Sequence, residues 1–395
     1  MIRALSSLYS AATVWRRRWY AGSPSRRSHL ARPVISVGNL TVGGSGKTPI
    51  AGYIARLLVE SGERPAILSR GYGRRVPRDG VTVVSDGTSV LAELDEAGDE
   101  PLMLARALPG VGVLVGTDRY LSGRLAERRL GATVHLLDDG FQHLELARDV
   151  DLLLVAEDDL QDQPLPAGRL RERISAASVA DAALITAGYD TAAERIGRAF
   201  GISPVFRVTR AIGAPRHVAG PRDSVVVPSG SRVFVVTGIA RPDRFVADIS
   251  SVGWEMSGMI EFRDHHPFTA RDIRRIAVEA EASASMLVLT TEKDAVRLAV
   301  CDLGNLPIAS VPLVVGVEPA DAFRQWLIGR IGASRESGAA NPQSSNPQST
   351  IGDPQHPTNR RLRTAPSDTW PSRLSTGSRM SIRTLRARAP CSHRG

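Results

Sequence analysis

Short apolar runs and helix-like stretches alternate through residues 31–203. Apolar runs of about four to eight residues are typical of buried strands, and apolar positions repeated every three or four residues are typical of helices. Strands that alternate with helices favour a parallel α/β sheet, which binds ligands beyond the carboxyl ends of its strands. We predict strands at residues 33–37, 66–69, 111–115, 133–137, 150–155 and 182–186, and a helix at residues 48–61.

The pattern changes after residue 203. Residues 204–228 are expected to form connecting strands, and residues 229–333 a smaller α/β domain. Beyond residue 333 the chain is rich in Ser, Pro, Gln and Arg and contains a near-repeat. Such a composition lacks the apolar content to form a core, so we predict a disordered basic tail at residues 334–395.

Residues 1–30 are expected to contain an amphipathic helix. Its apolar positions recur at helical spacing, and a cluster of arginines and aromatic residues follows at residues 16–20. Such a pattern suits an anionic membrane surface. The alternative is a helix that packs on its own domain and leaves a basic end in solvent. The apolar positions are Ile2, Leu5, Leu8, Tyr9, Ala12 and Trp15.

Composition and charge narrow the function. The net charge is +9, but ten arginines and three acidic residues lie beyond residue 333, so most of the charge belongs to the tail. A nearly neutral body argues against a nucleic-acid-binding protein. The two cysteines are far apart, which excludes a disulfide framework. No apolar run approaches the length of about 18–20 residues that crosses a bilayer. We therefore expect a protein that stays in the cytoplasm unless it lies on a membrane surface.

A glycine-rich loop joins the first predicted strand to the helix that follows it. Glycines let backbone N–H groups turn toward phosphate oxygens, and a helix N-terminus favours negative charge. Lys47 would reach the β- and γ-phosphates of ATP, and the Thr48 hydroxyl would bind Mg²⁺. The strict motif has glycine where this chain has Thr41, and a glycine turn without a ligand is the alternative. The predicted nucleotide-binding residues are Thr41, Val42, Gly43, Gly44, Ser45, Gly46, Lys47 and Thr48.

Two carboxylates, Asp138 and Asp139, follow the strand predicted at residues 133–137. A carboxylate at the end of a neighbouring strand is where a P-loop enzyme holds magnesium. Asp-Asp-Gly is also ordinary turn chemistry, so the residues alone leave both interpretations open. Together with the glycine loop, they predict a P-loop NTPase-like parallel sheet flanked by helices over residues 31–203, with Mg²⁺ held by Thr48, Asp138 and Asp139.

Only two of the fifty basic residues are lysines, Lys47 and Lys293. A compact ammonium group suits a phosphate loop better than a guanidinium fork. For Lys293 we expect a structural ion pair with Asp294 or Glu292 and no part in the mechanism.

Several separate stretches of the chain stand out together: VGNLTVGGSGKTP (37–49), SRGYGR (69–74), GDEP (98–101), GTDR (116–119), DDGFQH (138–143), PAGRLRE (166–172), GIARPDRF (238–245), DHH (264–266) and TEKDAVR (291–297). In combination they resemble the tetraacyldisaccharide 4'-kinase family, the lipid A 4'-kinases of Gram-negative bacteria. The resemblance implies transfer of the γ-phosphate of ATP to the 4'-hydroxyl of a tetraacyldisaccharide 1-phosphate, which gives lipid IVA. It also implies a peripheral protein on the cytoplasmic face of the inner membrane, engaged by its first helix. Thr41 fits, because the family's loop also lacks the strict first glycine.

The resemblance also assigns roles to residues. It implies that Asp99 is the catalytic base and that a histidine of the DHH stretch pairs with it, here mapped to His265 with His266 close behind. On pattern alone, Asp99 is a helix start before a proline, and His265 and His266 are surface or capping residues. Lys47 completes the implied catalytic set. The implied substrate-binding residues are Arg70, Arg74, Arg119, Gln142 and His143, and Glu172 matches the family without a defined role.

The chain departs from the family at Leu144, where a basic residue is expected, and in its long tail. A different class, a P-loop ATPase acting as a regulatory switch, remains the alternative. Such switches often carry a lysine near the start of the loop, where this chain has Val42.

Overall fold

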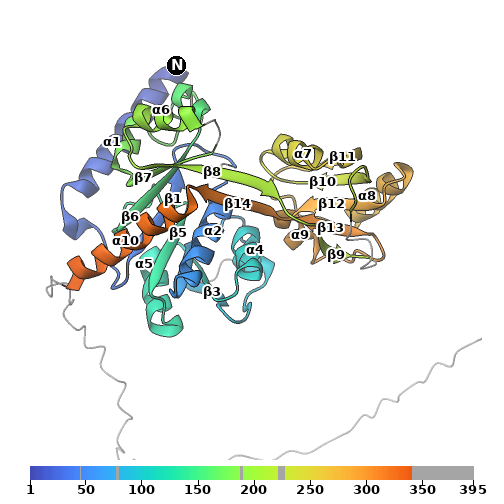
Figure 1. The fold of residues 1–395 in the computed structure, drawn as a ribbon, viewed down its shortest axis with the longest axis horizontal. Coiled ribbons are helices and arrows are strands. Elements are labelled where there is room, and N and C mark those ends of the chain that lie inside the picture. The colour runs from blue at the N-terminus through green and yellow to red at the C-terminus, as the bar shows by residue number, and fades with distance from the viewer. Residues whose placement is uncertain (45, 77–79, 187–189, 221–226, 340–395) are drawn as a thin grey trace, which may run out of the picture. The chain divides into compact units, whose positions relative to one another are not determined.

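The computed structural model describes residues 1–339, apart from residues 45, 77–79, 187–189 and 221–226. Within these residues a nine-stranded sheet has the order β14-β8-β7-β6-β1-β5-β2-β4-β3 (Figure 1). Its strands are parallel except at the two edges, where β3 pairs with β4 and β14 pairs with β8 in antiparallel fashion. The strands are β1 (Val34–Asn39), β2 (Pro65–Ser69), β3 (Val81–Asp86), β4 (Gly112–Gly116), β5 (Val134–Asp138), β6 (Val150–Val155), β7 (Ala182–Ile185), β8 (Val205–Ile212) and β14 (Leu313–Glu318).

The position of β1 fixes the place of the site. β1 lies between β5 and β6, and Val37 is in register with Asp138 on one side and Leu152 on the other. Because parallel strands end at the same edge, the loop after β1 and the last residue of β5 are neighbours.

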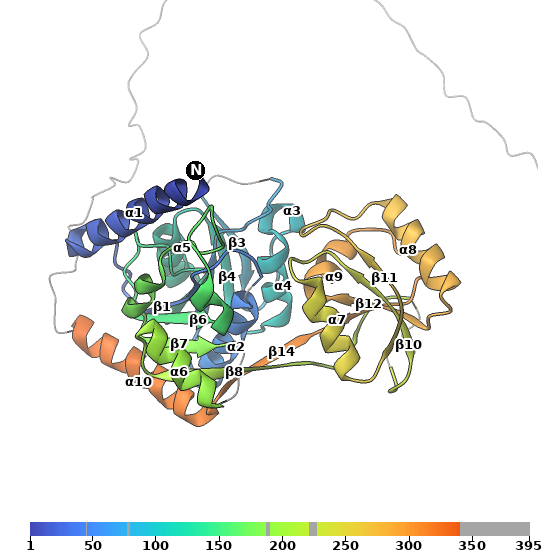
Figure 2. The same ribbon diagram turned by 90° about the horizontal axis from the view of Figure 1, so that it is seen from above.

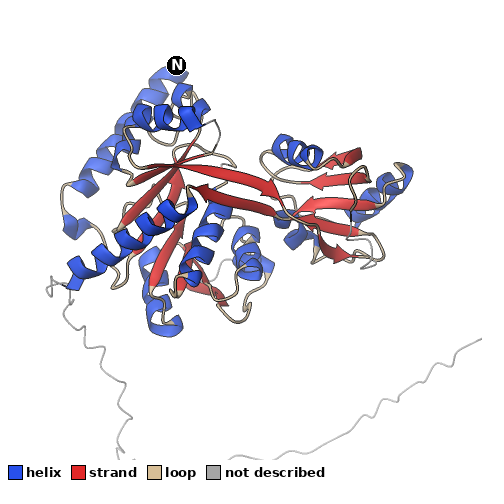
Figure 3. Ribbon diagram, in the orientation of Figure 1, coloured by secondary structure: helices blue, strands red, loops and turns tan. Residues whose placement is uncertain are grey.

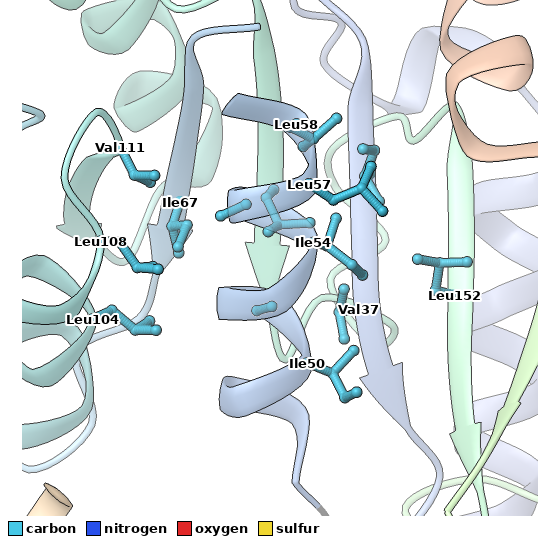
Figure 4. Packing of buried hydrophobic residues seen from close by; sticks show 14 of the residues in the cluster. Val37, Ile50, Ile54, Leu57, Leu58, Ile67, Leu104, Leu108, Val111 and Leu152 are labelled. Carbon is cyan, nitrogen blue, oxygen red and sulfur yellow. The ribbon is translucent and has the colours of Figure 1, made fainter. Parts of the chain in front are cut away.

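Helices cover both faces of this sheet (Figure 3). On one face α2 (Lys47–Glu60) buries Ile50, Ile54 and Leu58 against β1 and its neighbours (Figure 4). On the other face α6 (Asp190–Phe200) packs against alternate residues of β6 and β7. Strands buried on both faces read as continuous apolar runs, which is why the sequence pattern predicted them. The predicted mostly parallel α/β sheet flanked by helices is confirmed.

The remaining short elements around this sheet are α3 (Leu94–Ala97), α4 (Asp99–Ala107), α5 (Arg119–Leu125), η1 (Pro24–Arg26), η2 (Ala126–Leu130), η3 (Glu157–Gln161) and η4 (Ile174–Val179).

A second, five-stranded sheet has the order β11-β10-β12-β13-β9 (Figure 2). α7 (Pro242–Ser251) buries Phe245 and Ile249 on one face. α8 (Ala270–Ala282) and α9 (Glu292–Leu298) contribute Ile276 and Leu298 to the core on the other. The strands are β9 (Arg216–Ala219), β10 (Arg232–Thr237), β11 (Glu255–Glu261), β12 (Leu287–Thr291) and β13 (Ile308–Val311).

The predicted boundaries of the smaller domain are wrong. β8 lies in the stretch expected to be connecting, yet it is a member of the larger sheet, and β9 belongs to the second. β14 and α10 (Ala320–Ala339) were expected in the smaller domain but return to the larger sheet, where Phe323 and Leu327 enter its core. The pairing of β8 with β14 joins segments about one hundred residues apart in sequence. Local patterns carry no information on such a pairing.

The predicted start of the disordered tail is also wrong. α10 continues to Ala339, so residues 334–339 are helical. Ser334 donates a hydrogen bond to Asp149, and Arg335 forms an ion pair with Glu63 at 2.7 Å. Residues 340–395 lie outside the described part of the chain.

The N-terminal helix α1 (Ile2–Ala21) faces the protein with its polar side. Ser6 and Ser10 are buried, and the Ser6 hydroxyl donates to the Pro164 carbonyl at 2.7 Å. The apolar side is open, with Leu8 69% and Trp15 68% exposed. The helix therefore packs on its own domain, as one of the two alternatives expected, but it does so through its polar side and leaves its apolar side exposed. Across the described residues, no helix combines the length and hydropathy of a membrane span.

The arginines of α1 are only partly available to a membrane. Arg17 forms a buried two-point ion pair with Glu172, at 2.7 and 2.9 Å, and lies over the Phe141 ring. Arg16 donates to the Gln142 carbonyl at 2.9 Å. These contacts tie α1 to the loop after β5, which gives Glu172 a structural role that the sequence did not define.

We predict that Phe323→Ala destabilises the fold by about 3–5 kcal/mol, because it leaves a cavity between α10 and the larger sheet. Urea unfolding of the full chain measures this loss. Val314→Ala, at a half-exposed position of the neighbouring β14, is the control and should cost much less. Equal losses would contradict the placement of α10 in this core.

Candidate active site

The phosphate loop runs from the end of β1 to the first turn of α2. Gly43 and Gly46 have φ of +102° and +86°, values that favour glycine. Nothing lies within 4 Å of a Cβ placed at either residue, so backbone conformation rather than space requires glycine there. Gly46 is the N-cap of α2, so the first N–H groups of the helix face the loop. Ser45, one of the predicted nucleotide-binding residues, lies outside the described residues.

Residues 169–171 form backbone hydrogen bonds with the phosphate loop. Val42 N–H donates to the Arg169 carbonyl at 2.9 Å, and Arg171 N–H donates to the Leu40 carbonyl at 2.6 Å. The buried Thr41 hydroxyl accepts a hydrogen bond from the Asn39 side-chain amide at 2.9 Å. The loop therefore has a defined shape, and Thr41 contributes to it through its side chain.

Lys47 and Thr48 both meet the predicted carboxylates. The Lys47 ammonium donates to Asn39 Oδ1 at 2.9 Å and lies 3.5 Å from Asp139. The Thr48 hydroxyl lies 3.1 Å from Asp138 Oδ2 and 3.4 Å from Glu100 Oε2. The structure thus brings together the glycine loop and the acidic end of β5, as the sequence predicted.

Asp138 is a buried carboxylate whose burial is not fully offset by hydrogen bonds or positive charges. Its Oδ1 atom has no hydrogen-bond partner among the described residues. Burial, followed by repulsion from Glu100 and Asp139, raises its pKa to about 7. An unpaired buried carboxylate oxygen beside a threonine hydroxyl fits a hard cation such as Mg²⁺. In the described chain no three His, Cys, Asp or Glu side chains converge as a metal cluster. Mg²⁺ usually takes one or two carboxylates and completes its shell with phosphate and water.

The pKa of Asp139 is shifted in the opposite direction from that of Asp138. The Arg171 guanidinium donates to both of its oxygens at 2.8 Å, and Lys47 approaches from the loop. Burial opposes ionisation, but Lys47 and Arg171 outweigh it and hold the pKa of Asp139 below its usual value. The two adjacent carboxylates are therefore distinct, and Asp139 serves to hold two cations beside the loop.

A second buried carboxylate, Asp99, starts helix α4. Gly98 precedes it with φ of +85°, and a Cβ at Gly98 would lie 2.8 Å from the Tyr72 carbonyl oxygen. Asp99 Oδ2 lies 2.8 Å from His265 Nδ1. His265 has φ of +58°, an uncommon backbone conformation that tends to occur at functional sites. His266 instead contacts Asp272 at 3.1 Å, so the structure pairs Asp99 with His265.

Two cationic side chains of α9 lie beside the Asp99–His265 pair, and α9 packs against α4. Arg297 Nε lies 3.6 Å from Asp99 Oδ2. Lys293 contacts Glu100, Asp264 and His265. Burial raises the pKa of Asp99, but the His265 hydrogen bond and the charges of Lys293 and Arg297 hold the pKa below its usual value. The carboxylate is therefore ionised at neutral pH.

Lys293 is the site residue that sequence reasoning missed. The expected ion pair with Asp294 or Glu292 is wrong, because Asp294 is buried with Arg297 and Glu292 contacts Arg216. The available signal was the rarity of lysine in a chain that uses arginine at nearly every basic position.

The predicted substrate-binding arginines lie in different environments. Arg70 is exposed at the end of β2. Arg119 is buried, and its guanidinium donates to the Thr117 carbonyl at 3.2 Å. Burial and then the nearby Arg70 charge lower the pKa of Arg119. Arg74 is turned toward the protein and donates to the Gly71 carbonyl at 3.2 Å.

Gln142 and His143 lie directly after the two carboxylates. The Gln142 amide donates to the Asn39 carbonyl at 3.0 Å and accepts from Arg171 at 3.2 Å, so it links the ends of β1 and β5. Burial, followed by the Arg119 charge, lowers the pKa of His143 to about 4. His143 is therefore a neutral imidazole at neutral pH.

Comparison with known proteins agrees with this geometry. A family profile described as "Tetraacyldisaccharide-1-P 4'-kinase" matches residues 1–332. The tetraacyldisaccharide 4'-kinase of Desulfotalea psychrophila is 40% identical over 303 residues, which are 74% of this chain and 86% of that protein. The enzyme of the same name from Koribacter versatilis is 38% identical over 332 residues, covering 82% of this chain and 97% of that protein.

A solved structure is similar as well. The crystal structure of LpxK from Aquifex aeolicus in complex with ATP has a TM-score of 0.66 and 32% sequence identity, and the match covers 83% of this chain and 97% of that chain. Because the profile matches most of the chain and curated relatives match it above 30% identity over most of their length, this chain belongs to the tetraacyldisaccharide-1-phosphate 4'-kinase family.

Proposed function

We propose that this chain transfers the γ-phosphate of ATP to the 4'-hydroxyl of a tetraacyldisaccharide 1-phosphate and so forms lipid IVA. One observation carries the proposal. Asp99, a buried carboxylate paired with His265, is followed in sequence by Glu100, whose carboxylate lies 3.4 Å from the Thr48 hydroxyl of the phosphate loop. A base beside a triphosphate-binding loop is the arrangement a kinase requires. The names of the relatives and the ATP bound in the Aquifex aeolicus structure support the same reaction.

The donor side is formed by the phosphate loop. The backbone N–H groups after Gly43 and the Lys47 ammonium would hold the β- and γ-phosphates. Thr48 and Asp138 would hold Mg²⁺, which neutralises charge on the phosphates when it is bound. The contacts of Asp139 with Lys47 and Arg171 support a role in orienting these cations. A direct metal contact of Asp139 stays a prediction.

The acceptor side uses Asp99 as base. The 4'-hydroxyl oxygen forms a bond to the γ-phosphorus as the bond to the β-phosphate oxygen breaks, and ADP leaves with that electron pair. The hydroxyl proton passes to the Asp99 carboxylate, whose Oδ2 atom is held by His265. Arg119 lies near Asp138 and Asp139, with Arg70 beside it, and the two guanidinium groups would contact phosphate oxygens of donor or acceptor.

The N-terminal helix supports a peripheral position on the cytoplasmic face of the inner membrane. Its outward side carries Ile2, Leu5, Leu8, Trp15 and Trp19, all exposed. Apolar and tryptophan side chains gathered on the open face of a helix favour the interfacial region of a bilayer. A lipid-linked sugar would reach the site from that surface.

We predict that Asp99→Asn lowers turnover by roughly 10²–10⁴-fold while ATP affinity changes little, because the carboxylate acts on the acceptor. The assay is transfer of labelled phosphate from ATP to a tetraacyldisaccharide 1-phosphate in detergent, with ATP binding measured separately. Asp321→Asn, at an exposed position of α10, is the matched control. If the folded wild-type chain hydrolyses ATP but forms no labelled lipid, the proposed function is contradicted and a regulatory ATPase is favoured.

We predict that Asp138→Asn removes a pH dependence of stability measured without Mg²⁺. The pKa of Asp138 is raised from 3.8 to about 7, so the protonated form is the one that folding favours. The stability that protonated Asp138 gives to the folded state is fully present below about pH 4 and is lost as the pH rises through about 7. Between pH 5 and pH 8 the wild type should therefore lose roughly 2–4 kcal/mol relative to the variant. Urea unfolding in the presence of a chelator measures this difference. If the free energy of unfolding changes with pH in the same way in the wild type and the variant, the raised pKa of Asp138 is contradicted.

We predict that Leu8→Glu combined with Trp15→Glu weakens binding to vesicles containing anionic lipid by roughly tenfold or more, because two apolar side chains lose their burial in the interface. Vesicle flotation measures the bound fraction. Val314→Glu is the control, since this residue is also half-exposed but lies on β14. Equal binding of both variants would show that α1 is not the membrane contact.

A further inference from the structure

The loop that follows β10 lies against the phosphate loop. A Cβ placed at Gly44 would lie 3.5 Å from the Cβ of Ala240 and 3.8 Å from the Cγ of Arg241, which are ordinary contact distances. Gly44 follows a strand of the larger sheet, whereas Ala240 and Arg241 follow a strand of the second sheet. The second sheet therefore places a cationic residue beside the loop that is predicted to bind a triphosphate.

A buried carboxylate holds the start of this second loop. The Gly238 N–H lies 3.1 Å from both carboxylate oxygens of Asp294, and the Thr237 hydroxyl donates to the same carboxylate at 3.3 Å. Arg297 donates to the Gly238 carbonyl at 2.8 Å. The loop ends at Pro242, which begins α7. The backbone is thus fixed on both sides of Arg241, so its place beside the phosphate loop is a built feature of the fold.

The Arg241 guanidinium is held only by a weak local ion pair. It donates to the Asp243 carboxylate at 3.1 and 3.2 Å, two residues along the same loop. The two side chains are 40% and 62% exposed. Water screens such a pair, which contributes little to stability. Rotation of the side chain beyond Cγ would therefore exchange Asp243 for a more highly charged acceptor at little cost.

A triphosphate at this loop needs more positive charge than the loop itself provides. Glu100, Asp138 and Asp139 gather at its far end and repel one another. The ammonium of Lys47 lies beside Asp139, 3.5 Å away. A further cation would offset the repulsion between these carboxylates and the phosphates. A guanidinium suits that task, because its planar fork gives two parallel hydrogen bonds to phosphate oxygens.

We propose that Arg241 binds phosphate oxygens of ATP and so adds a residue of the second sheet to the donor site. The inference rests on the proposed function, in which ATP at the phosphate loop is the phosphoryl donor. It gives a role to the GIARPDRF stretch (238–245), which the mechanism otherwise leaves unused. The competing explanation is purely structural. Asp158 of η3 also acts on the charge of Arg241 from the larger sheet, and a salt link between them would join the two loops without any phosphate.

A disulfide tests the placement of the two loops without reference to activity. Gly44→Cys combined with Ala240→Cys, in a full chain with Cys301→Ser and Cys391→Ser, should form an intramolecular disulfide on mild oxidation. The Cβ separation of 3.5 Å lies within the range of about 3.5–4.5 Å that a disulfide spans. Intact mass and mobility without reductant detect the bond.

Arg232→Cys in place of Ala240→Cys is the control for this disulfide. Arg232 begins β10, five residues before its end and roughly 16 Å away along the strand, so the control pair should not cross-link. A folded Gly44–Ala240 double variant that forms no more disulfide than the control would overturn the proposal.

Titration calorimetry with Mg²⁺ and ATP tests the phosphate contact. Arg241→Ala should lower ATP affinity by about tenfold or more, because a charge-assisted contact is lost, and Arg241→Lys should recover part of the loss. Arg232→Ala is the matched control, since it removes an exposed arginine of the preceding strand that pairs with Glu255, and it should bind ATP as the wild type does. Unchanged ATP affinity in folded Arg241→Ala would overturn the proposal.

Asp158→Asn separates the phosphate contact from the salt link. Under the proposal this variant binds ATP at least as tightly as the wild type, because an acceptor that competes for Arg241 is weakened. If Asp158→Asn loses as much ATP affinity as Arg241→Ala, the salt link explains the effect and the proposal is overturned.

The lipid assay separates this inference from the proposed function. If ATP affinity depends on Arg241 but the wild type phosphorylates no lipid, the proposed function is refuted and the phosphate contact stands. If the wild type phosphorylates lipid and Arg241→Ala does so with an unchanged KM for ATP, the proposed function stands and the phosphate contact is refuted.

Discussion

The buried carboxylate of Asp138 is the constraint around which this site is arranged. It ends a central strand, lies in register with Val37 of β1, and has one oxygen without a partner in the described chain. A charge in that position needs a cation, and the phosphate loop that follows β1 supplies the place where a metal–triphosphate complex would bring one. Lys47 offsets part of this charge, but its ammonium donates to Asn39 and lies beside Asp139. The donor half of the site is thus prepared for a charged ligand.

The acceptor half is built from both sheets. Asp99 begins α4 beside the larger sheet, whereas His265, Lys293 and Arg297 belong to the second. Asp99, the proposed base, therefore pairs with a histidine that lies 166 positions away in sequence. Lys293 also reaches Glu100, which meets Thr48, so a continuous set of polar contacts links the base to the phosphate loop.

The sequence predicted the parts of this arrangement that depend on local pattern. Continuous apolar runs gave the central strands, because both faces of those strands are buried. The glycine loop and Asp138 met because parallel strands end at one edge. The pairing of β8 with β14 was missed, since antiparallel edges formed by distant segments leave no local pattern.

The remaining differences have related physical reasons. The apolar spacing of α1 was read correctly, but which side packs on the protein is decided by Ser6, Ser10 and the Arg17–Glu172 ion pair, which are tertiary contacts. Lys293 was assigned to sequence neighbours because an ion pair with an adjacent residue is the simplest expectation. Its actual partners come from α4 and from the turn before α8. Residue type pointed to Lys293, but only the fold identified its partners.

The most direct test of the account is a structure of the full chain with Mg²⁺, a non-hydrolysable ATP analogue and the tetraacyldisaccharide 1-phosphate. The account predicts the 4'-hydroxyl oxygen within about 3 Å of an Asp99 carboxylate oxygen, facing the γ-phosphate, with the metal held by Thr48 and Asp138. A disaccharide whose 4'-hydroxyl lies away from Asp99, with another group beside that oxygen, would contradict the central claim that this buried carboxylate is the base.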